Sequence, residues 1–184
     1  EFLVQDDVPS VFTGLQLAGD RVVLCGLHPR PPEPLRDQDS TPRDAELVVV
    51  GRWVAQQNGA PMIVAGDLND VAWSTTTQLF LRLSGLLDPR MGRGFYNTYN
   101  ARNPLARWPL DHLFHSNHFR LVELRRCADI GSDHYPVLIE LSYEPDAPGQ
   151  PASPAAAGDE EDAAERIETQ MDAEPIKDTR TPGA

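Results

Sequence analysis

Short apolar runs separated by polar and turn-forming residues dominate the first 144 positions of the chain. Two of these runs, residues 11–17 and 21–27, flank Ala18-Gly19-Asp20, whose composition suits the turn of a hairpin. Further runs of strand length cover residues 61–65, 110–114, 119–124 and 137–141. We therefore expect strands at these positions, with residues 61–65 as the central one.

Two other stretches carry the start and stop signals of helices. In the first, Thr41 is the expected N-cap, Pro42 takes the first helical position, and Asn58-Gly59 ends the helix. The second follows Ser74 as N-cap and runs from about residue 75 to 84. Each stretch has an apolar side that can cover a sheet. Strands that alternate with helices through short loops indicate an α/β fold.

The central apolar run stops abruptly on Gly66-Asp67-Leu68-Asn69. If the backbone stays extended past Gly66, Asp67 and Asn69 point the same way while Leu68 turns back into the core. Asp67 can hold a hard cation or a water, and Asn69 can donate its amide to an anionic oxygen. Glycine, aspartate and asparagine are also what a strand-ending turn uses, so this stretch by itself leaves a turn and a site open.

Other segments place a histidine or a carboxylate at the end of an apolar run. His28 ends the run at 21–27 and enters a proline-rich loop, which we interpret as a site loop, with a polyproline ligand for a partner as the alternative. In the run 110–114, alternation puts Asp111 and His112 on opposite faces. We assign Asp111 to the site and expect His112 to be buried and hydrogen-bonded.

The remaining histidines and the tryptophan near the central run have less specific surroundings. We expect His115 and His118 to be solvated turn residues. Trp73 and Ser74 follow the candidate site and either line it or serve as core residue and helix cap.

Residues 87–109 form a long irregular stretch, and long loops in a compact domain are often functional. We place substrate selection here. Arg102 and Arg107 are candidate phosphate contacts and Tyr99 is a candidate stacking surface, although surface decoration explains them equally well.

Charge and composition separate the end of the chain from the rest. Residues 1–144 carry 13 arginines and 18 acidic residues, net −5, whereas residues 145–184 carry 3 basic and 10 acidic residues, net −7. We expect 145–184 to be an acidic, Pro/Ala-rich disordered tail with a transient helix at Asp159–Met171.

The acidic body of residues 1–144 lacks the electrostatic footprint of a structural nucleic-acid binder. Cys25 and Cys127 are interpreted as reduced thiols, and no run is long enough for a transmembrane segment.

Three of these segments together resemble a known family. Gly66-Asp67-Leu68-Asn69, Leu110-Asp111-His112 and Ser132-Asp133-His134 occur in the order of the G-D-x-N, x-D-H and S-D-H elements of the endonuclease/exonuclease/phosphatase family. The resemblance covers Glu1 to Glu144. It implies a DNase I-like four-layered α/β-sandwich, in which two packed β-sheets are flanked by helices, here without its N-terminal part.

The resemblance also implies an activity, the metal-dependent hydrolysis of phosphodiester or phosphomonoester bonds. His134 is then the base that activates water or a stabiliser of the transition state, and Asp111 orients it and fixes its tautomer. Asp133 is the metal carboxylate of this half of the domain, and Asp67 positions the attacking water or a second metal. Hard oxygen ligands favour Mg²⁺, with Mn²⁺ as a substitute, over zinc.

Two further residues receive roles from the same resemblance. Asn69 is expected to donate to a non-bridging phosphate oxygen, and His28 to the phosphate or the leaving oxygen. The substrate is a phosphoester, with nucleic acid, phospholipid and small phosphoesters all open. A non-catalytic binding module or degenerate relative that acts through its acidic tail is the alternative.

The chain departs from the family pattern in its metal ligands. The asparagine and glutamate that other members carry on early strands have no counterpart here, so we expect the C-terminal part of a longer domain, inactive and only partly folded by itself. The wording L-H-P-R-P-P and G-D-L-N-D-V-A-W-S resembles a bacterial subgroup whose members commonly carry membrane helices before the catalytic domain. That would attach the parent protein to a membrane; otherwise it would be cytoplasmic.

Overall fold

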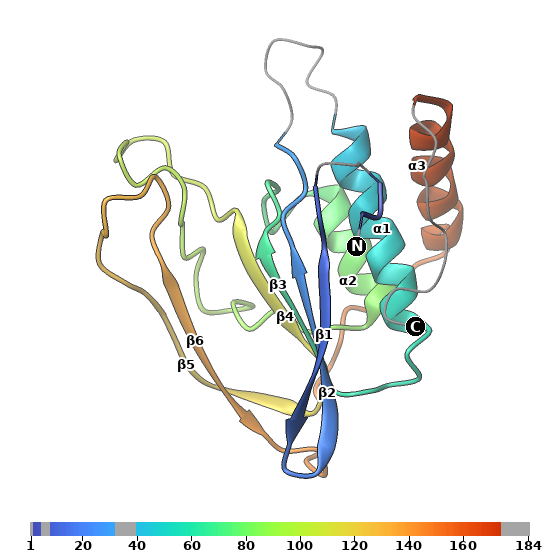
Figure 1. Cartoon of the computed structure of the whole chain (residues 1–184), viewed down its shortest axis with the longest axis horizontal. Helices are drawn as coiled ribbons and strands as arrows, with labels where there is room; N and C mark the ends of the chain where they lie inside the picture. Colours follow the sequence, from blue (N-terminus) through green and yellow to red (C-terminus); the bar gives the residue numbers. More distant parts are fainter. Residues whose placement is uncertain (1, 5–7, 32–39, 174–184) are drawn as a thin grey trace.

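A computed structural model describes residues 2–4, 8–31 and 40–173 (Figure 1). Its elements follow the chain in the order β1 (Val11–Leu17), β2 (Asp20–Leu27), α1 (Thr41–Ala55), β3 (Met62–Asp67), α2 (Thr75–Ser84), β4 (Asp111–His115), β5 (Phe119–Arg126), β6 (Val137–Tyr143) and α3 (Asp159–Ala173). Each strand expected from an apolar run is present, which confirms the predicted α/β content.

The first four strands form one sheet in the order β1-β2-β3-β4. β1 and β2 are an antiparallel hairpin, β2 and β3 are parallel, and β3 and β4 are antiparallel. A parallel pair needs a crossover, and α1 supplies it. The register pairs Leu27 with Gly66 and Asp67 with Asp111. The end of β2, the end of β3 and the start of β4 therefore meet at one edge of the sheet.

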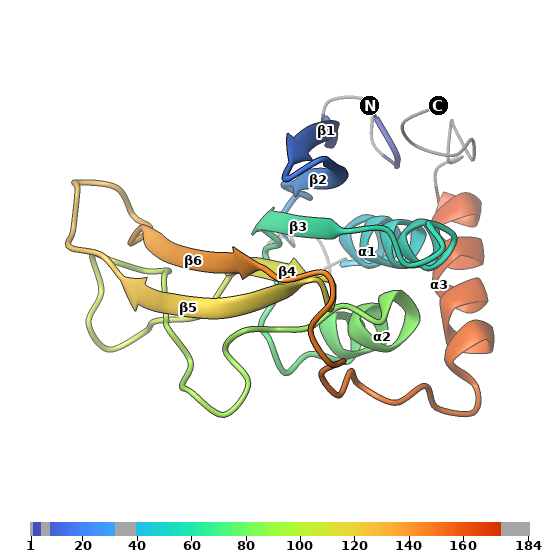
Figure 2. The same ribbon diagram turned by 90° about the horizontal axis from the view of Figure 1, so that it is seen from below.

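The helices lie on one side of this sheet, and α3 lies beyond α1 on the side away from the strands (Figure 2). The main core joins α1 to the strands and includes Leu47, Trp53, Val64 and Phe114. β5 and β6 form a second, two-stranded antiparallel sheet with a register shift between Leu121 and Glu123. Within the described residues, no helix combines the length and the apolarity that a bilayer crossing requires.

The helix boundaries agree with the sequence for α2 and differ for α1, which begins one residue earlier than expected and ends at Ala55, before Asn58-Gly59. Ser74 accepts a hydrogen bond from the Thr77 amide at 2.9 Å, and α2 ends at Gly85, whose φ of 67° suits glycine. The expected N-cap of α1, Thr41, is already helical, and Ser40 takes the cap position. Ser40 makes no side-chain hydrogen bond to the helix backbone, and its hydroxyl donates to the Asp44 carboxylate at 3.1 Å.

The expected tail at 145–184 contains α3, which packs on α1 and α2 where the sequence predicts only a transient helix, and residues 174–184 lie outside the described part of the chain. Ala163 is fully buried in a cluster with Val48 and Leu79. Acidic residues of α3 also have arginine partners: Glu160 pairs with Arg52 of α1, and Asp159 with Arg82 of α2, each at 2.9 Å. α1 has apolar residues on both of its faces, and a helix that is apolar on both faces needs a cover on each. The sheet covers one face and α3 the other.

Two histidines differ from the expectation of solvated turn residues. His115 is the last residue of β4 and is buried, with its Nδ1 2.9 Å from the Ser116 carbonyl. Burial lowers the pKa of His115. His118 is half-buried and shares a 2.9 Å hydrogen bond with the Ser116 hydroxyl. Both rings close the turn between β4 and β5.

Candidate active site

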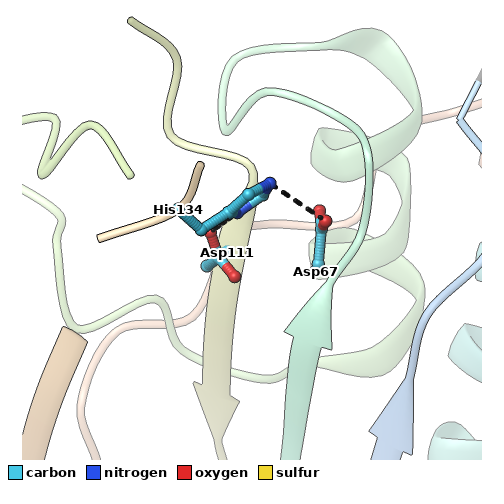
Figure 3. Close-up of side chains that lie close together, drawn as sticks. All are labelled: Asp67, Asp111 and His134. Atoms are coloured by element: carbon cyan, nitrogen blue, oxygen red, sulfur yellow. Dashed lines mark hydrogen bonds and ion pairs between the residues drawn. The ribbon is translucent and has the colours of Figure 1, made fainter. Parts of the chain in front are cut away.

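Three segments bring their polar side chains together at the shared edge of the sheet (Figure 3). Asp67 ends β3, Asp111 begins β4, and His134 precedes β6. His134 Nδ1 lies 2.7 Å from Asp111 Oδ2, and His134 Nε2 lies 3.6 Å from Asp67 Oδ2. The imidazole therefore stands between two carboxylates that the β3–β4 register places side by side.

The contact with Asp111 determines which ring nitrogen of His134 carries the proton. A carboxylate can only accept, so Nδ1–H donates to Asp111 and Nε2 is left for chemistry. Partial burial acts to lower the pKa of His134, but the hydrogen bond and charge of Asp111, with the charges of Asp67 and Asp133, raise it above its usual value. The ring is thus built to accept a proton at Nε2.

Asp67 is the more buried of the two carboxylates that face His134. Burial raises its pKa, the hydrogen bond from the Asn69 amide lowers it, and the negative charge of Asp111 raises it further. The charges of His134 and His28 act in the opposite direction. A carboxyl group with a raised pKa binds a proton more readily than an ordinary aspartate.

His28 reaches the same carboxylate from the neighbouring strand. Its Nε2 lies 3.8 Å from Asp67 Oδ2, and its side chain is 71% exposed. Gly66 makes this approach possible, because a Cβ there would lie 1.8 Å from the Leu27 carbonyl oxygen. A side chain at position 66 would force β2 and β3 apart and separate His28 from Asp67.

Asn69 holds the turn that follows Asp67. Its φ is 49°, its amide N–H donates to Asp67 Oδ1 at 2.9 Å, and its side-chain Nδ2 donates to the Pro29 carbonyl at 2.9 Å. Leu68 is buried in the core, as the alternation predicts. The side-chain amide of Asn69 thus has a protein partner, and this hydrogen bond connects the loop after His28 to the turn after Asp67.

Asp133 lies apart from these groups. It is exposed, and the Ser132 hydroxyl approaches its Oδ1 at 3.4 Å. In the described part of the chain, the candidate metal-binding group comprises Asp67, Asp111 and His134, and Asp133 is outside it. Its charge still contributes to the raised pKa of His134.

The three candidates in the long loop have different positions. The Tyr99 ring lies 5.0 Å from the His134 ring, so it borders the site. Arg107 donates to the Tyr135 hydroxyl at 2.9 Å and lies over the Tyr135 ring, one residue from His134. Arg102 is exposed. Tyr99 therefore borders the site, Arg107 packs against Tyr135 next to it, and Arg102 lies on the surface.

A cavity of about 480 Å³ opens beside the three polar groups. Its lining includes the three polar groups and an apolar part from both sheets, with Ala65 and Leu113 from the first and Val137 and Ile139 from the second. Trp73 is half exposed and packs its ring edge-on against Phe95 at 5.2 Å, outside this cavity. Ser74 acts as helix cap and donates to Asp70, so neither residue lines the cavity.

Sequence reasoning missed a buried network on the other face of β4. Arg90 is 7% exposed, and its hydrogen bonds to Asp88 include those from Nε at 2.9 Å and from Nη2 at 2.8 Å. It also contacts His112 Nδ1 at 2.6 Å and the Asp111 carbonyl at 3.3 Å. The only available signal was the pair of opposite charges two residues apart in Asp88-Pro89-Arg90, which is common on surfaces.

His112 is buried and hydrogen-bonded, as predicted. Arg90 can only donate, so Nδ1 of His112 accepts from it and Nε2–H donates to the Asp70 carbonyl at 2.8 Å. Burial and the positive charge of Arg90 lower the pKa of His112 to about 4. The ring is therefore neutral at neutral pH.

The donor set at the shared edge suits a divalent cation. Asp67, Asp111 and His134 each offer one ligand atom, and these atoms all lie within 4.8 Å of one another. Two of the three donors are carboxylate oxygens, the ligand type that hard cations prefer. Oδ2 of Asp111 accepts the hydrogen bond from His134, and the Oδ1 atom is not part of that contact.

Comparisons with known proteins give the following. Residues 2–134 match the sequence profile of the Endonuclease/Exonuclease/phosphatase family. No curated protein sequence matches the chain.

Solved structures match by fold. An endonuclease/exonuclease/phosphatase family protein from Bacteroides thetaiotaomicron has a TM-score of 0.53 at 20% identity, over 69% of this chain and 52% of that one. The human Nocturnin catalytic domain has a TM-score of 0.56 at 15% identity, over 73% and 52%. A humanized D. rerio TDP2 has a TM-score of 0.58 at 17% identity, over 72% and 60%. The chain therefore spans only about half to three fifths of these proteins, and its predicted DNase I-like sandwich fold is confirmed.

Proposed function

Because the chain belongs to the endonuclease/exonuclease/phosphatase family, we propose that it contributes the catalytic histidine and its two aspartates to a metal-dependent phosphoester hydrolase. The observation that carries this proposal is the placement of His134 between Asp111 at 2.7 Å and Asp67 at 3.6 Å. A histidine held by one carboxylate through Nδ1, with Nε2 facing a second one, is suited to general base catalysis.

In the proposed reaction, His134 Nε2 takes a proton from the attacking water. Asp111 accepts the Nδ1–H bond, keeps the ring in the required tautomer and stabilises the imidazolium that forms. Asp67 lies next to Nε2 and positions the water that His134 activates. The attacking water displaces the leaving oxygen from phosphorus, and that oxygen needs a proton.

His28 is the proposed partner of the phosphate or the leaving oxygen. It is exposed at the rim and lies on the side of Asp67 that faces away from β4. Tyr99 offers a stacking surface beside His134, and Arg102 and Arg107 are proposed as phosphate contacts. For Asn69 to contact the phosphate, its side chain must exchange its hydrogen bond to Pro29 for one to the substrate.

The proposed cofactor is Mg²⁺, with Mn²⁺ as a substitute, because the carboxylates of Asp67 and Asp111 supply the hard oxygen ligands that these cations prefer. Asp67 and the second oxygen of Asp111 would hold it, and Asp133 is a further carboxylate that a loop movement would have to bring inward. When bound, the cation would neutralise charge that develops on the phosphoryl oxygens.

The substrate is proposed to be a phosphoester, with a nuclease, a lipid phosphodiesterase and a phosphomonoesterase all compatible with the site. The net charge of −5 over residues 1–144 disfavours long polyanions. Fold alone does not separate these activities.

The test is hydrolysis by the full-length protein of bis(4-nitrophenyl) phosphate and of 4-nitrophenyl phosphate, with Mg²⁺ and with EDTA. We expect EDTA to abolish nitrophenol release and His134→Ala to lower it by about 10²–10⁴-fold. His118→Ala is the matched control, since this histidine is held by Ser116 in the turn after β4. Equal rates in all samples would instead support a non-catalytic binding module.

We also propose that the 184 residues by themselves do not catalyse hydrolysis. Two carboxylates and one imidazole hold Mg²⁺ weakly, because this cation prefers six oxygen ligands in an octahedron. The same nitrophenol assay on the 184-residue chain checks this, and Mg²⁺-dependent release above the His134→Ala background would contradict it.

A further inference from the structure

The turn after Asp67 is held from outside the site by an arginine of α1. Asn69 has a φ of 49°, a conformation that costs a non-glycine residue energy and persists only when its neighbours hold it. Its carbonyl accepts a hydrogen bond from Arg43 Nη1 at 2.8 Å, while its amide N–H donates to Asp67 Oδ1 at 2.9 Å. Arg43 and Asp67 thus both form hydrogen bonds with the backbone of Asn69, Arg43 with its carbonyl and Asp67 with its N–H.

Arg43 is itself fixed by neighbouring carboxylates. Its side chain is 11% exposed, and Asp44 Oδ1 accepts from Nε at 2.9 Å and from Nη2 at 2.7 Å. Asp70 Oδ1 lies 3.7 Å from Nη1. The planar guanidinium can serve Asp44 and the Asn69 carbonyl at once, which the single point charge of a lysine cannot do.

The other oxygen of Asp44 leads to the C-terminal helix. Asp44 Oδ2 accepts from Arg166 of α3 at 3.2 Å, and Arg166 also donates to Thr76 of α2 at 2.9 Å and to Asp162 at 2.8 Å. A continuous set of hydrogen bonds therefore runs from α3 through Arg166, Asp44 and Arg43 to Asn69 and Asp67. The remaining α1–α3 ion pair, Arg52 with Glu160, has no connection to Arg43 among the described contacts.

We propose that Arg43 is a positioning residue of the active site and that Arg166 of α3 holds it in place. The acidic C-terminal segment then has a function: its helix supports the turn that carries Asp67. This inference rests on the proposed function for its catalytic meaning, but the support of the turn is a property of the folded chain and can be measured without activity.

The direct test is amide hydrogen exchange of Asn69, followed by NMR on the full-length protein. With its carbonyl released, the turn opens more often and the Asn69 amide exchanges faster. We expect Arg43→Ala to raise the exchange rate of Asn69 by about tenfold or more, and Arg166→Ala by about two- to fivefold. The amide of Val64, in the middle of β3, reports on opening of the whole sheet and should change by less than about twofold.

Arg52→Ala is the matched control, because it removes an α1–α3 ion pair that does not lead to Arg43. We expect it to leave Asn69 exchange within about twofold of the wild type. Arg43→Lys should behave like Arg43→Ala if the fork geometry matters, whereas Arg166→Lys should restore much of the protection, since one charge suffices to reach Asp44. If Arg43→Ala does not fold, the difference in Asn69 exchange rate between Arg166→Ala and Arg52→Ala tests the proposal.

In the full-length enzyme, Arg166→Ala should lower kcat by about two- to fivefold with little change in KM, and Arg52→Ala should lower neither. Unchanged Asn69 exchange in Arg43→Ala, or equal effects of Arg166→Ala and Arg52→Ala, would overturn the positioning role. Absence of hydrolysis by the wild type would overturn the proposed function while the exchange result still decides the support of the turn.

Discussion

The two faces of β4 place adjacent residues in opposite surroundings. On one face, Asp111 meets His134 beside an open cavity, and neighbouring carboxylates raise the pKa of that histidine. On the other face, His112 is buried against Arg90, and its pKa falls to about 4. The comparison shows that the two faces of one short strand have different roles. Its cavity face carries groups suited to proton transfer, and its helix-side face carries a neutral histidine within a closed polar network.

The same ring is used in the opposite tautomer on the two faces. His134 donates from Nδ1 to a carboxylate and keeps Nε2 for the site, whereas His112 accepts at Nδ1 from Arg90 and donates from Nε2 to the Asp70 carbonyl. The network behind β4 also reaches the site, since Arg90 donates to the Asp111 carbonyl and His112 holds the residue after Asn69. The helix-side face thus stabilises the backbone on which the cavity face depends.

The largest expected effect on stability comes from breaking the buried pair. Arg90→Ala leaves Asp88 buried without its partner and should lower the free energy of unfolding by about 3–5 kcal/mol, measured from urea unfolding curves. Arg93→Ala, an exposed arginine three positions along, is the control and should change it by less than about 0.5 kcal/mol. Similar losses in both variants would show that Arg90 acts as a surface residue.

The next effect is a pH dependence of stability from His112. Its pKa is 6.5 when unperturbed and about 4 in the fold, so the unfolded chain binds more protons between these values. The free energy of unfolding that depends on a neutral His112 is fully present above pH 6.5 and is lost as the pH falls to about 4. The total loss over this range is about 3 kcal/mol. Unfolding curves of the wild type and of His112→Gln across this range should therefore converge as the pH falls.

A constant difference between those two curves from neutral pH to pH 4 would contradict the buried neutral state of His112. His118→Gln, at a histidine outside the network, is the control for loss of an imidazole and should run parallel to the wild type. The difference between curves isolates His112 from the acidic groups that titrate in the same range.

The smallest effect is expected on the cavity face. Asp111→Asn should change the free energy of unfolding by less than about 1 kcal/mol, because the side chains of Asp111 and His134 are 33% and 25% exposed and such pairs contribute little. Loss of the negative charge next to Asp67 offsets part of the lost hydrogen bond. A loss as large as that of Arg90→Ala, in the same urea measurement, would erase the distinction between the two faces.

Local sequence patterns predicted much of this fold. Apolar runs located the strands, and the Ser74 signal located the start of α2. Alternation predicted that Leu68 and His112 are buried and that Asp111 faces the cavity. These features depend on the period of a strand or on the chemistry of a cap, and both are visible within a few residues. The family motifs likewise identified His134, Asp67 and Asp111 before the register joined them.

Other features required partners distant in sequence. The acidic residues of α3 suggested disorder because their arginine partners on α1 and α2 lie far away along the chain, for example Asp159 and Arg82. The burial of His115 depends on how the turn after β4 packs, and the partner of the Asn69 amide is a proline carbonyl from another strand end. A motif gives a residue's type and order but not which contact its side chain makes.

The sequence by itself indicated the α/β pattern, the family and a set of six candidate site residues that includes Asp67, Asp111 and His134, because periodicity and motif order are local properties of the chain. The tertiary structure alone decided that Asp133 lies outside the triplet formed by those three, that Arg90 is buried behind Asp111, and that α3 supports the Asp67 turn through Arg166 and Arg43. The physical reason is that burial and pairing of charges depend on which surfaces meet, and that is settled only when the layers pack.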